Sequence, residues 1–209
     1  MYKPFIQPPA LARLFYPNRL WRMNPLEPSV YLTFDDGPHP DITPFVLEQL
    51  SRVGAKASFF CIGSRVAAYP LVYQQIIEQG HRVGNHTQEH LNAWHTNQQD
   101  YLKDVAVAAE LIDSNLFRPP YGKLPWQIAK QIPTVIKAPA QIIMWDILSG
   151  DFDHRLTAAA CLENCRRYLR PGSIIVLHDS EKAWDRLKIL LPELLSLIGS
   201  AGYSLKALP

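Results

Sequence analysis

Length, composition and charge limit the kinds of protein that this chain can be. Its 209 residues are enough for one sizeable domain, and 47% apolar with 19% charged residues is typical of a globular protein. The net charge of +2, without a run of basic residues, argues against nucleic acid as a partner.

Strand-like and helical patterns alternate along the chain. The proline-rich residues 1–28 predict an extended lead-in, not a helix, that packs on the domain. Apolar, β-branched runs predict strands at residues 30–34, 57–62, 82–85, 117–118, 141–145, 173–177 and 203–205. Helical periodicity and end signals predict helices at residues 44–53 (N-capped by Thr43), 71–79, 97–114, 126–131, 157–169 and 182–200. This alternation favours an α/β fold with parallel strands, in a single barrel-like domain of about seven units.

Two pairs of residues carry ligands suited to a hydrolytic metal ion. Asp35 and Asp36 follow the first expected strand, and His86 and His90 follow the third. A catalytic zinc ion typically takes three protein ligands and leaves one position open. One carboxylate and both histidines would fill that requirement, the histidines sharing one face of a helical turn, and the other carboxylate would be free for proton transfer. Taken alone, each pair also fits an ordinary turn or a surface role.

Two later segments add candidate catalytic groups. Arg118 and Tyr121 lie in the segment RPPYG, whose rigid backbone could aim the Tyr121 amide at a developing oxyanion while Arg118 pairs with a carboxylate. His178 ends a buried strand, where an imidazole oriented by a carboxylate can act as a catalytic acid or base. A rigid surface loop and a core-edge hydrogen bond are the ordinary alternatives. Residues just past the strand ends of a β/α barrel meet at one mouth, so we expect these groups to be neighbours.

The ordered motifs TFDDGP, HTQEH, RPPYG, WDILSGDF and VLHD resemble those of the polysaccharide deacetylase family. The resemblance extends from about residue 30 to residue 203, nearly the whole chain. It implies a distorted (β/α) barrel of about seven strands, with residues 29–209 as the catalytic domain. It also implies a divalent metal cofactor, zinc in first place with cobalt or nickel as alternatives.

The resemblance implies a role for each matching residue. The metal-ligand positions correspond to Asp36, His86 and His90. The catalytic positions correspond to Asp35 as general base, Arg118 holding that base, the Tyr121 amide as oxyanion donor, His178 as general acid, and Asp151 orienting the acid.

The sequence departs from the family pattern at few places. Val176 stands where leucine is usual, and Phe152 where tryptophan is common after the aspartate; neither change removes a catalytic group. Asp146 is an alternative to Asp151, because it could serve Arg118 or His178 instead.

The resemblance implies a hydrolase that cleaves carbon–nitrogen amide bonds, removing N-acetyl groups from an oligo- or polysaccharide that contains N-acetylglucosamine. The alternatives are an O-acetyl carbohydrate esterase and a catalytically inactive carbohydrate-binding module. Trp94 and Trp126 could stack on a sugar ring or serve only in packing.

The sequence also gives expectations for cellular location and oligomeric state. The chain shows neither a secretory signal nor a membrane span, so we expect a cytoplasmic location, with export only if the native N-terminus is missing. We also expect a monomer.

Overall fold

The computed structural model describes residues 6–209. Within this range a nine-stranded sheet, whose ladders are parallel, forms the centre of the molecule. The strands are β1 (Arg19–Leu20), β2 (Ser29–Asp35), β3 (Ser58–Cys61), β4 (Arg82–Asn85), β5 (Leu116–Phe117), β6 (Gln141–Ile143), β7 (Ile147–Leu148), β8 (Ile174–His178) and β9 (Ser204–Leu205). Their order along the sheet is β1-β6-β5-β4-β3-β2-β8-β7, with β9 pairing to β2.

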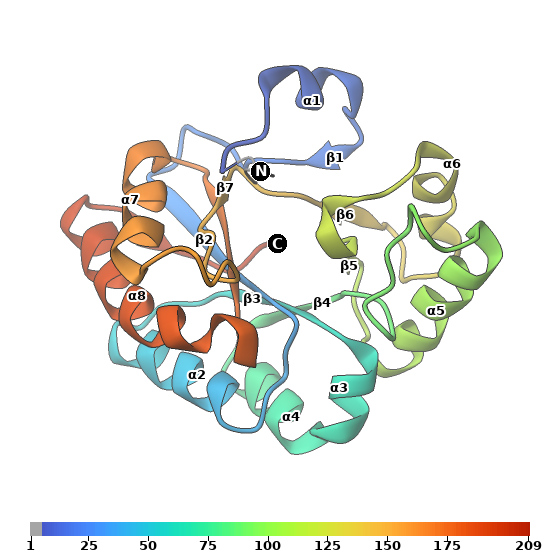
Figure 1. The fold of residues 1–209 in the computed structure, drawn as a ribbon, viewed down its shortest axis with the longest axis horizontal. Helices are drawn as coiled ribbons and strands as arrows, with labels where there is room; N and C mark the ends of the chain where they lie inside the picture. The colour runs from blue at the N-terminus through green and yellow to red at the C-terminus, as the bar shows by residue number, and fades with distance from the viewer. Residues whose placement is uncertain (1–5) are drawn as a thin grey trace.

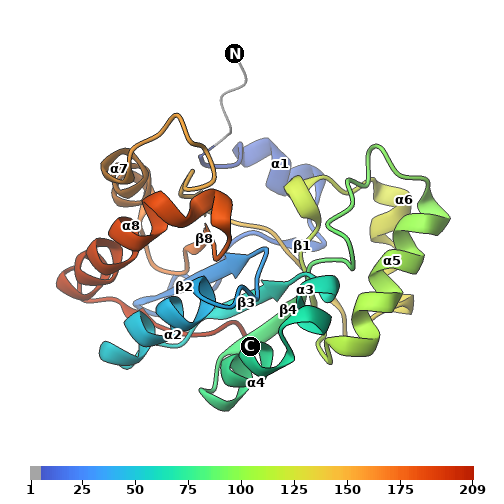
Figure 2. The same ribbon diagram turned by 60° about the horizontal axis from the view of Figure 1, so that its bottom comes forward.

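Helices surround the strands (Figure 1). They are α1 (Ala10–Phe15), α2 (Ile42–Arg52), α3 (Gly63–Ala68), α4 (Pro70–Glu78), α5 (Gln98–Leu111), α6 (Trp126–Ala129), α7 (Ala158–Tyr168) and α8 (Glu181–Ser200), with 3₁₀ turns η1 (Pro120–Gly122) and η2 (Ile132–Thr134). Figure 2 shows β2, β3 and β4 side by side, with α2 and α4 against one face. Because the path ends at β1 and β7 without a ladder between them in the described range, the barrel is open. The predicted distorted (β/α) barrel in one domain is therefore confirmed, with nine strands instead of about seven.

The lead-in differs from its predicted extended form. It contains the six-residue helix α1, which Pro9 precedes and Pro17 follows, so these prolines flank the helix instead of interrupting it. Strand β1 then pairs with β6, and the backbone N–H of Leu148 donates to the carbonyl of Ile6 at 2.8 Å. The lead-in thus supplies the edge strand β1 and also contacts β7 at the opposite edge of the sheet. The domain boundary at residue 29 stays a prediction.

Two helices differ from the sequence-based prediction. Helix α2 begins at Ile42 after the N-cap Asp41, so Thr43 is not the cap. The Thr43 hydroxyl instead accepts a hydrogen bond from the backbone N–H of His39 at 2.8 Å and donates one to Asp179. Helix α3 was not predicted, because it has only six residues and opens with a glycine, which gives a weak helical pattern.

The strand register brings the candidate site residues to one end of the sheet. Asp35 on β2 lies opposite His178 on β8. On the other side of β2, Cys61 pairs with Asn85, and Asn85 pairs with Phe117. The residues that follow these strand ends therefore emerge at the same edge, as expected for the mouth of a parallel barrel.

Apolar packing on both faces of the sheet holds this edge in place. Strand β2 is buried along its whole length, and the outer face packs on α2, α7 and α8 in the largest apolar cluster. A smaller cluster includes Tyr31, Phe60 and Ile174 from neighbouring strands. Burial of each large side chain contributes about 1.5–3 kcal/mol, so the framework under the site is firm. Among the described helices, none is long and apolar enough to cross a membrane.

Candidate active site

Asp36, His86 and His90 bring one carboxylate and two imidazoles together. Asp36 follows β2, and both histidines lie in the loop after β4. One ligand atom from each residue can be chosen so that all three lie within 4.8 Å of one another. Nε2 of His90 is 3.3 Å from Oδ1 of Asp36, and Nε2 of His86 is 3.7 Å from the same oxygen. This donor set fits a divalent ion of the zinc type.

A hydrogen bond sets the tautomer of His86. Its Nδ1–H donates to the carbonyl oxygen of Arg118 at 2.7 Å, which leaves the Nε2 lone pair facing the Asp36 carboxylate. Burial lowers the pKa of His86 to about 4, because Asp35 and Asp36 offset burial only in part. His86 is therefore neutral at pH 7, the form that binds a metal.

The Asp36 carboxylate is ionised for a related reason. Burial alone would raise its pKa, but the hydrogen bond from His90 and the nearby His178 outweigh burial and hold the pKa well below its ordinary value. The Ser180 hydroxyl donates to its second oxygen at 3.4 Å.

The i,i+4 spacing of the histidine pair predicted a helical turn, and this prediction was wrong. Residues 86–90 form an irregular loop in which Thr87 and His90 have positive φ angles of 67° and 54°. Such angles cost about 1–3 kcal/mol each and persist only where surroundings enforce them. Here the Thr87 N–H donates to the Asn85 side chain, and the Gln88 N–H donates to Asp104 at 2.7 Å. With left-handed backbone at Thr87 and His90, the loop places Nε2 of His90 3.3 Å from the Asp36 carboxylate.

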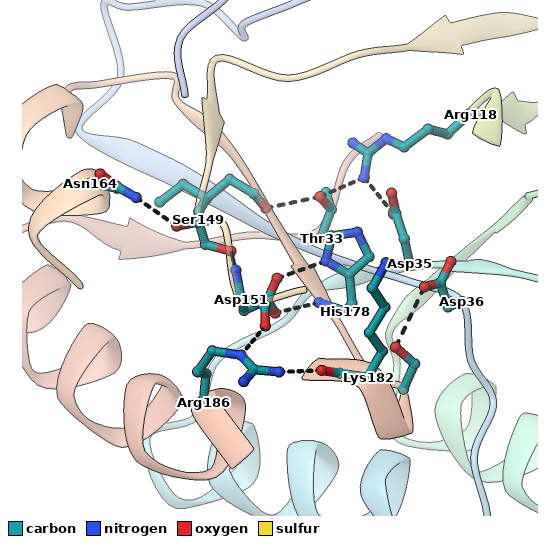
Figure 3. Close-up of polar contacts among 12 residues, drawn as sticks. Thr33, Asp35, Asp36, Arg118, Ser149, Asp151, Asn164, His178, Lys182 and Arg186 are labelled. Atoms are coloured by element: carbon teal, nitrogen blue, oxygen red, sulfur yellow. Dashed lines mark hydrogen bonds and ion pairs between the residues drawn. The ribbon is translucent and has the colours of Figure 1, made fainter. Parts of the chain in front are cut away.

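Asp35 is fixed by Arg118, a buried arginine with 0% exposure (Figure 3). Nη1 of Arg118 donates to Oδ1 of Asp35 at 2.6 Å and to the Thr33 hydroxyl at 2.7 Å. Nη2 donates to the Met144 carbonyl at 2.9 Å, and the guanidinium lies 4.1 Å from the centre of the Phe60 ring. With its donors occupied in this way, Arg118 holds one oxygen of Asp35 in place and leaves the other for a second partner.

His178 forms a second charged pair, with Asp151 (Figure 3). Nδ1 of His178 lies 2.7 Å from Oδ1 of Asp151, and the His178 backbone N–H donates to Oδ2 at 2.8 Å. Burial would lower the pKa of His178, but Asp151 first, then Asp36 and Asp35, overcome it and raise the pKa to about 9. The imidazole therefore holds a proton at neutral pH.

Tyr121 reaches the histidines from another loop. Its ring meets the His90 ring edge-on, with centroids 4.8 Å apart. The residue lies in η1 with φ 60° and ψ 6°, directly after Pro119 and Pro120, which set the loop direction. A Cβ on Gly122 would lie 2.3 Å from the Trp145 ring, so Trp145 packs directly beneath this loop.

Comparison with known proteins gives the family. The polysaccharide deacetylase family model matches residues 22–135. A peptidoglycan-N-acetylglucosamine deacetylase of Bacillus cereus is 31% identical over 88% of this chain and 87% of that protein. The chain belongs to the polysaccharide deacetylase family.

A second relative and a solved structure show the same similarity in sequence and in fold. A chitooligosaccharide deacetylase of Azorhizobium caulinodans is 33% identical over 76% of this chain and 77% of that protein. A crystal structure of a peptidoglycan N-acetylglucosamine deacetylase superposes with a TM-score of 0.87, covering 100% of this chain and 96% of that one. At 24% identity, this likeness shows the fold alone.

The structure shows which of the two candidate carboxylates contacts His178. Asp146 accepts hydrogen bonds from Arg170 at 2.6 and 2.9 Å and from the Ser173 hydroxyl at 2.9 Å, and it pairs with Arg13 of α1. It therefore ties the lead-in to the sheet, and the alternative that Asp146 serves Arg118 or His178 is wrong. Asp151 contacts His178 instead.

Two supporting residues were missed by the sequence reasoning. Thr33 bridges Arg118 and the Ile175 carbonyl, and its position in the TFDDGP motif was the available signal. Asp179, after His178 in VLHD, is buried against Gly37, where a Cβ would meet its carboxylate at 2.1 Å. Burial first, then the charge of Asp36, raises the pKa of Asp179 to about 8. Its backbone N–H donates to the Asp35 carbonyl at 3.2 Å, so it braces the turn that carries both aspartates.

Proposed function

We propose that this chain is a metal-dependent hydrolase that removes N-acetyl groups from an oligo- or polysaccharide containing N-acetylglucosamine. The observation that carries the proposal is the placement of two proton-transfer groups beside the ligand triad. Asp35 and His178 lie opposite each other on adjacent strands, and each is held by its own buried partner, Arg118 or Asp151.

Asp36, His86 and His90 are the proposed metal ligands. A divalent ion there, zinc in first place and cobalt or nickel as alternatives, would act as a Lewis acid on the acetyl carbonyl. The fit rests on the mixed carboxylate and imidazole donors and on the neutral His86.

Asp35 is the proposed general base. Arg118 occupies one of its oxygens, and the other can accept a proton from the attacking water. The backbone amide of Tyr121 is the proposed donor to the negative charge that develops on the acetyl oxygen.

His178 is the proposed general acid, oriented by Asp151. An amine leaves poorly unless it is protonated, so amide cleavage needs a group that holds a proton at the working pH. The raised pKa of His178 meets that need. The B. cereus and A. caulinodans relatives are named for deacetylation of peptidoglycan N-acetylglucosamine and of chitooligosaccharide, which supports an N-acetyl substrate.

Two alternatives remain testable. An O-acetyl carbohydrate esterase would use the same groups, and an inactive carbohydrate-binding module would need none of them. The complete set of base, acid and ligands disfavours the inactive module. Zinc-loaded protein should release acetate from N-acetylglucosamine oligomers faster than from acetylated xylan. Faster release from xylan would favour the esterase, and no release from either would favour the binding module.

We also propose that the protein acts as a monomer, since one chain supplies every group of the site; size measurement in solution tests this. The expected cytoplasmic location stays a prediction for cell fractionation.

A further inference from the structure

Asp104 is a half-buried aspartate on α5 that contacts the loop between the two candidate histidine ligands. Its Oδ2 atom accepts the backbone N–H of Gln88 at 2.7 Å and that of Glu89 at 3.3 Å. Hydrogen bonds to a charged acceptor are roughly twice as strong as neutral ones. Of the described side chains that bond to the backbone of residues 87–89, Asp104 is the only charged one. Its carboxylate is therefore the strongest side-chain hold on this loop.

The helix that carries Asp104 is firmly anchored. Asn97 caps its first turn by accepting the backbone N–H of Asp100 at 2.9 Å. Tyr101 and Val105, which lie on either side of Asp104 along the helix, are fully buried in an apolar cluster. The Asp104 carboxylate thus projects from a fixed element and not from a second loop.

Helix α3 holds the carbonyl groups of the same loop. The N–H of Gly63 donates to the Thr87 carbonyl at 2.9 Å, and the N–H of Ser64 donates to the Gln88 carbonyl at 3.0 Å. Helices α3 and α5 lie next to each other (Figures 1 and 2). A Cβ on Gly63 would lie 2.0 Å from the side-chain oxygen of Gln88 and 3.0 Å from Cβ of Ala108, so the helices and the loop are in close contact. The two helices therefore bind the loop together.

His90 depends on this backbone more than His86 does. The His86 ring donates to a backbone carbonyl at 2.7 Å, whereas no hydrogen bond to Nδ1 of His90 is found among the described residues. The ring that meets His90 edge-on belongs to Tyr121, whose side chain is itself exposed. His90 also has a φ of 54°, a conformation that costs about 1–3 kcal/mol and needs support from its surroundings. Asp104 gives that support through the two N–H groups that precede His90.

We propose that Asp104 is a positioning residue of the metal site, which holds the loop so that His90 lies in its ligand position before the metal binds. The inference rests on the metal ligands of the proposed function. A loop that already has its bound conformation pays less ordering entropy on binding, so affinity rises. Loss of a group that orients a metal ligand lowers metal affinity about 10–100-fold. A role in stability alone would leave the zinc affinity of the folded protein unchanged.

The zinc affinity of metal-free protein tests this role independently of activity. Competition with a chelator should give a zinc Kd about 10–100-fold higher for Asp104→Ala than for the wild-type protein. Asp104→Asn should stay within about fivefold of the wild type, because its amide oxygen still accepts both N–H groups. Asp100→Ala is the matched control. Asp100 is exposed, lies one turn earlier on α5 and bonds to Asn97, so its loss should leave the zinc Kd unchanged.

Urea titration of the same metal-free samples shows that each variant is folded where its Kd is measured. If Asp104→Ala does not fold, Asp104→Leu replaces it, because leucine has a similar shape and no acceptor. The positioning role is wrong if the folded alanine or leucine variant keeps the wild-type Kd. It is also wrong if Asp100→Ala weakens zinc binding equally, or if Asp104→Asn fails to restore it.

Acetate release from the zinc-loaded wild-type protein separates this inference from the proposed function. If the variants differ in zinc affinity as expected but the wild type releases no acetate, the deacetylase activity is wrong and the positioning role stands. If acetate is released and the zinc affinity is equal in all variants, the positioning role is wrong and the activity stands. Absence of zinc binding by the wild-type protein would overturn the ligand assignment, and this inference with it.

Discussion

At the scale of single residues, the site separates two carboxylates that are adjacent in sequence. Asp35 is joined to a buried guanidinium at 2.6 Å, whereas Asp36 faces two imidazoles. The positive φ of 79° at Asp36 accompanies this divergence, because it turns the second side chain away from the direction of the first. Two neighbouring residues of one type thereby have different partners.

The first prediction concerns that separation of roles. Asp35→Asn should retain bound zinc and lose about 10²–10⁴-fold in kcat, because it removes the base and keeps the ligands. His86→Ala should lose both zinc and activity. Metal analysis and acetate release are measured on the same samples. Near-normal rates in either variant would rule out these roles.

The second prediction concerns pH. The folded-state pKa of His178 is raised to about 9, so the acid form is present below that pH and is lost as the pH rises through it. Asp151→Asn removes the negative charge that favours the imidazolium, so the basic limb of the pH–rate profile should move to lower pH by about 1–3 units. Asp146→Asn is the control and should leave the limb in place. An unshifted limb in Asp151→Asn would contradict the acid role of His178.

At the scale of elements, the sequence predicted the longer strands and helices and missed several short elements. Strand β8 was predicted within one residue of its observed bounds, because a buried parallel strand is a compact apolar run between turn signals. Two-residue strands such as β1 and β7 have no period to detect, and tertiary pairing alone defines them. The loop at residues 86–90 was mistaken for a helical turn because i,i+4 spacing does not reveal positive φ.

The third prediction concerns the attachment of the lead-in. Asp146 is fully buried and joins Arg13 of α1 to Arg170 and Ser173, beside β8. Asp146→Asn weakens these charge-assisted bonds and should lower the free energy of unfolding by about 1–3 kcal/mol in urea titration. The kcat of the folded protein should stay near normal, since Asp146 contacts none of the proposed catalytic residues. A large loss of kcat with unchanged stability would return Asp146 to the active site.

At the scale of the whole molecule, the open parallel barrel gathers residues that are far apart in sequence. Asp35 and His178 are 143 positions apart and lie opposite each other on paired strands. The order of the motifs predicted which residues lie together. The alternation of strands and helices predicted that they lie at the mouth of the barrel, just past the strand ends. The partners of Asp146 and the brace supplied by Asp179 depend on packing between distant segments, which no local pattern encodes.

Zinc reconstitution tests metal dependence and deacetylation in one experiment. Protein stripped with a chelator should release no acetate from N-acetylglucosamine oligomers, and activity should return in proportion to zinc up to one ion per chain. The His86→Ala variant should bind no stoichiometric zinc and stay inactive. Undiminished acetate release after stripping, or none at full zinc occupancy, would contradict a metal-dependent deacetylase.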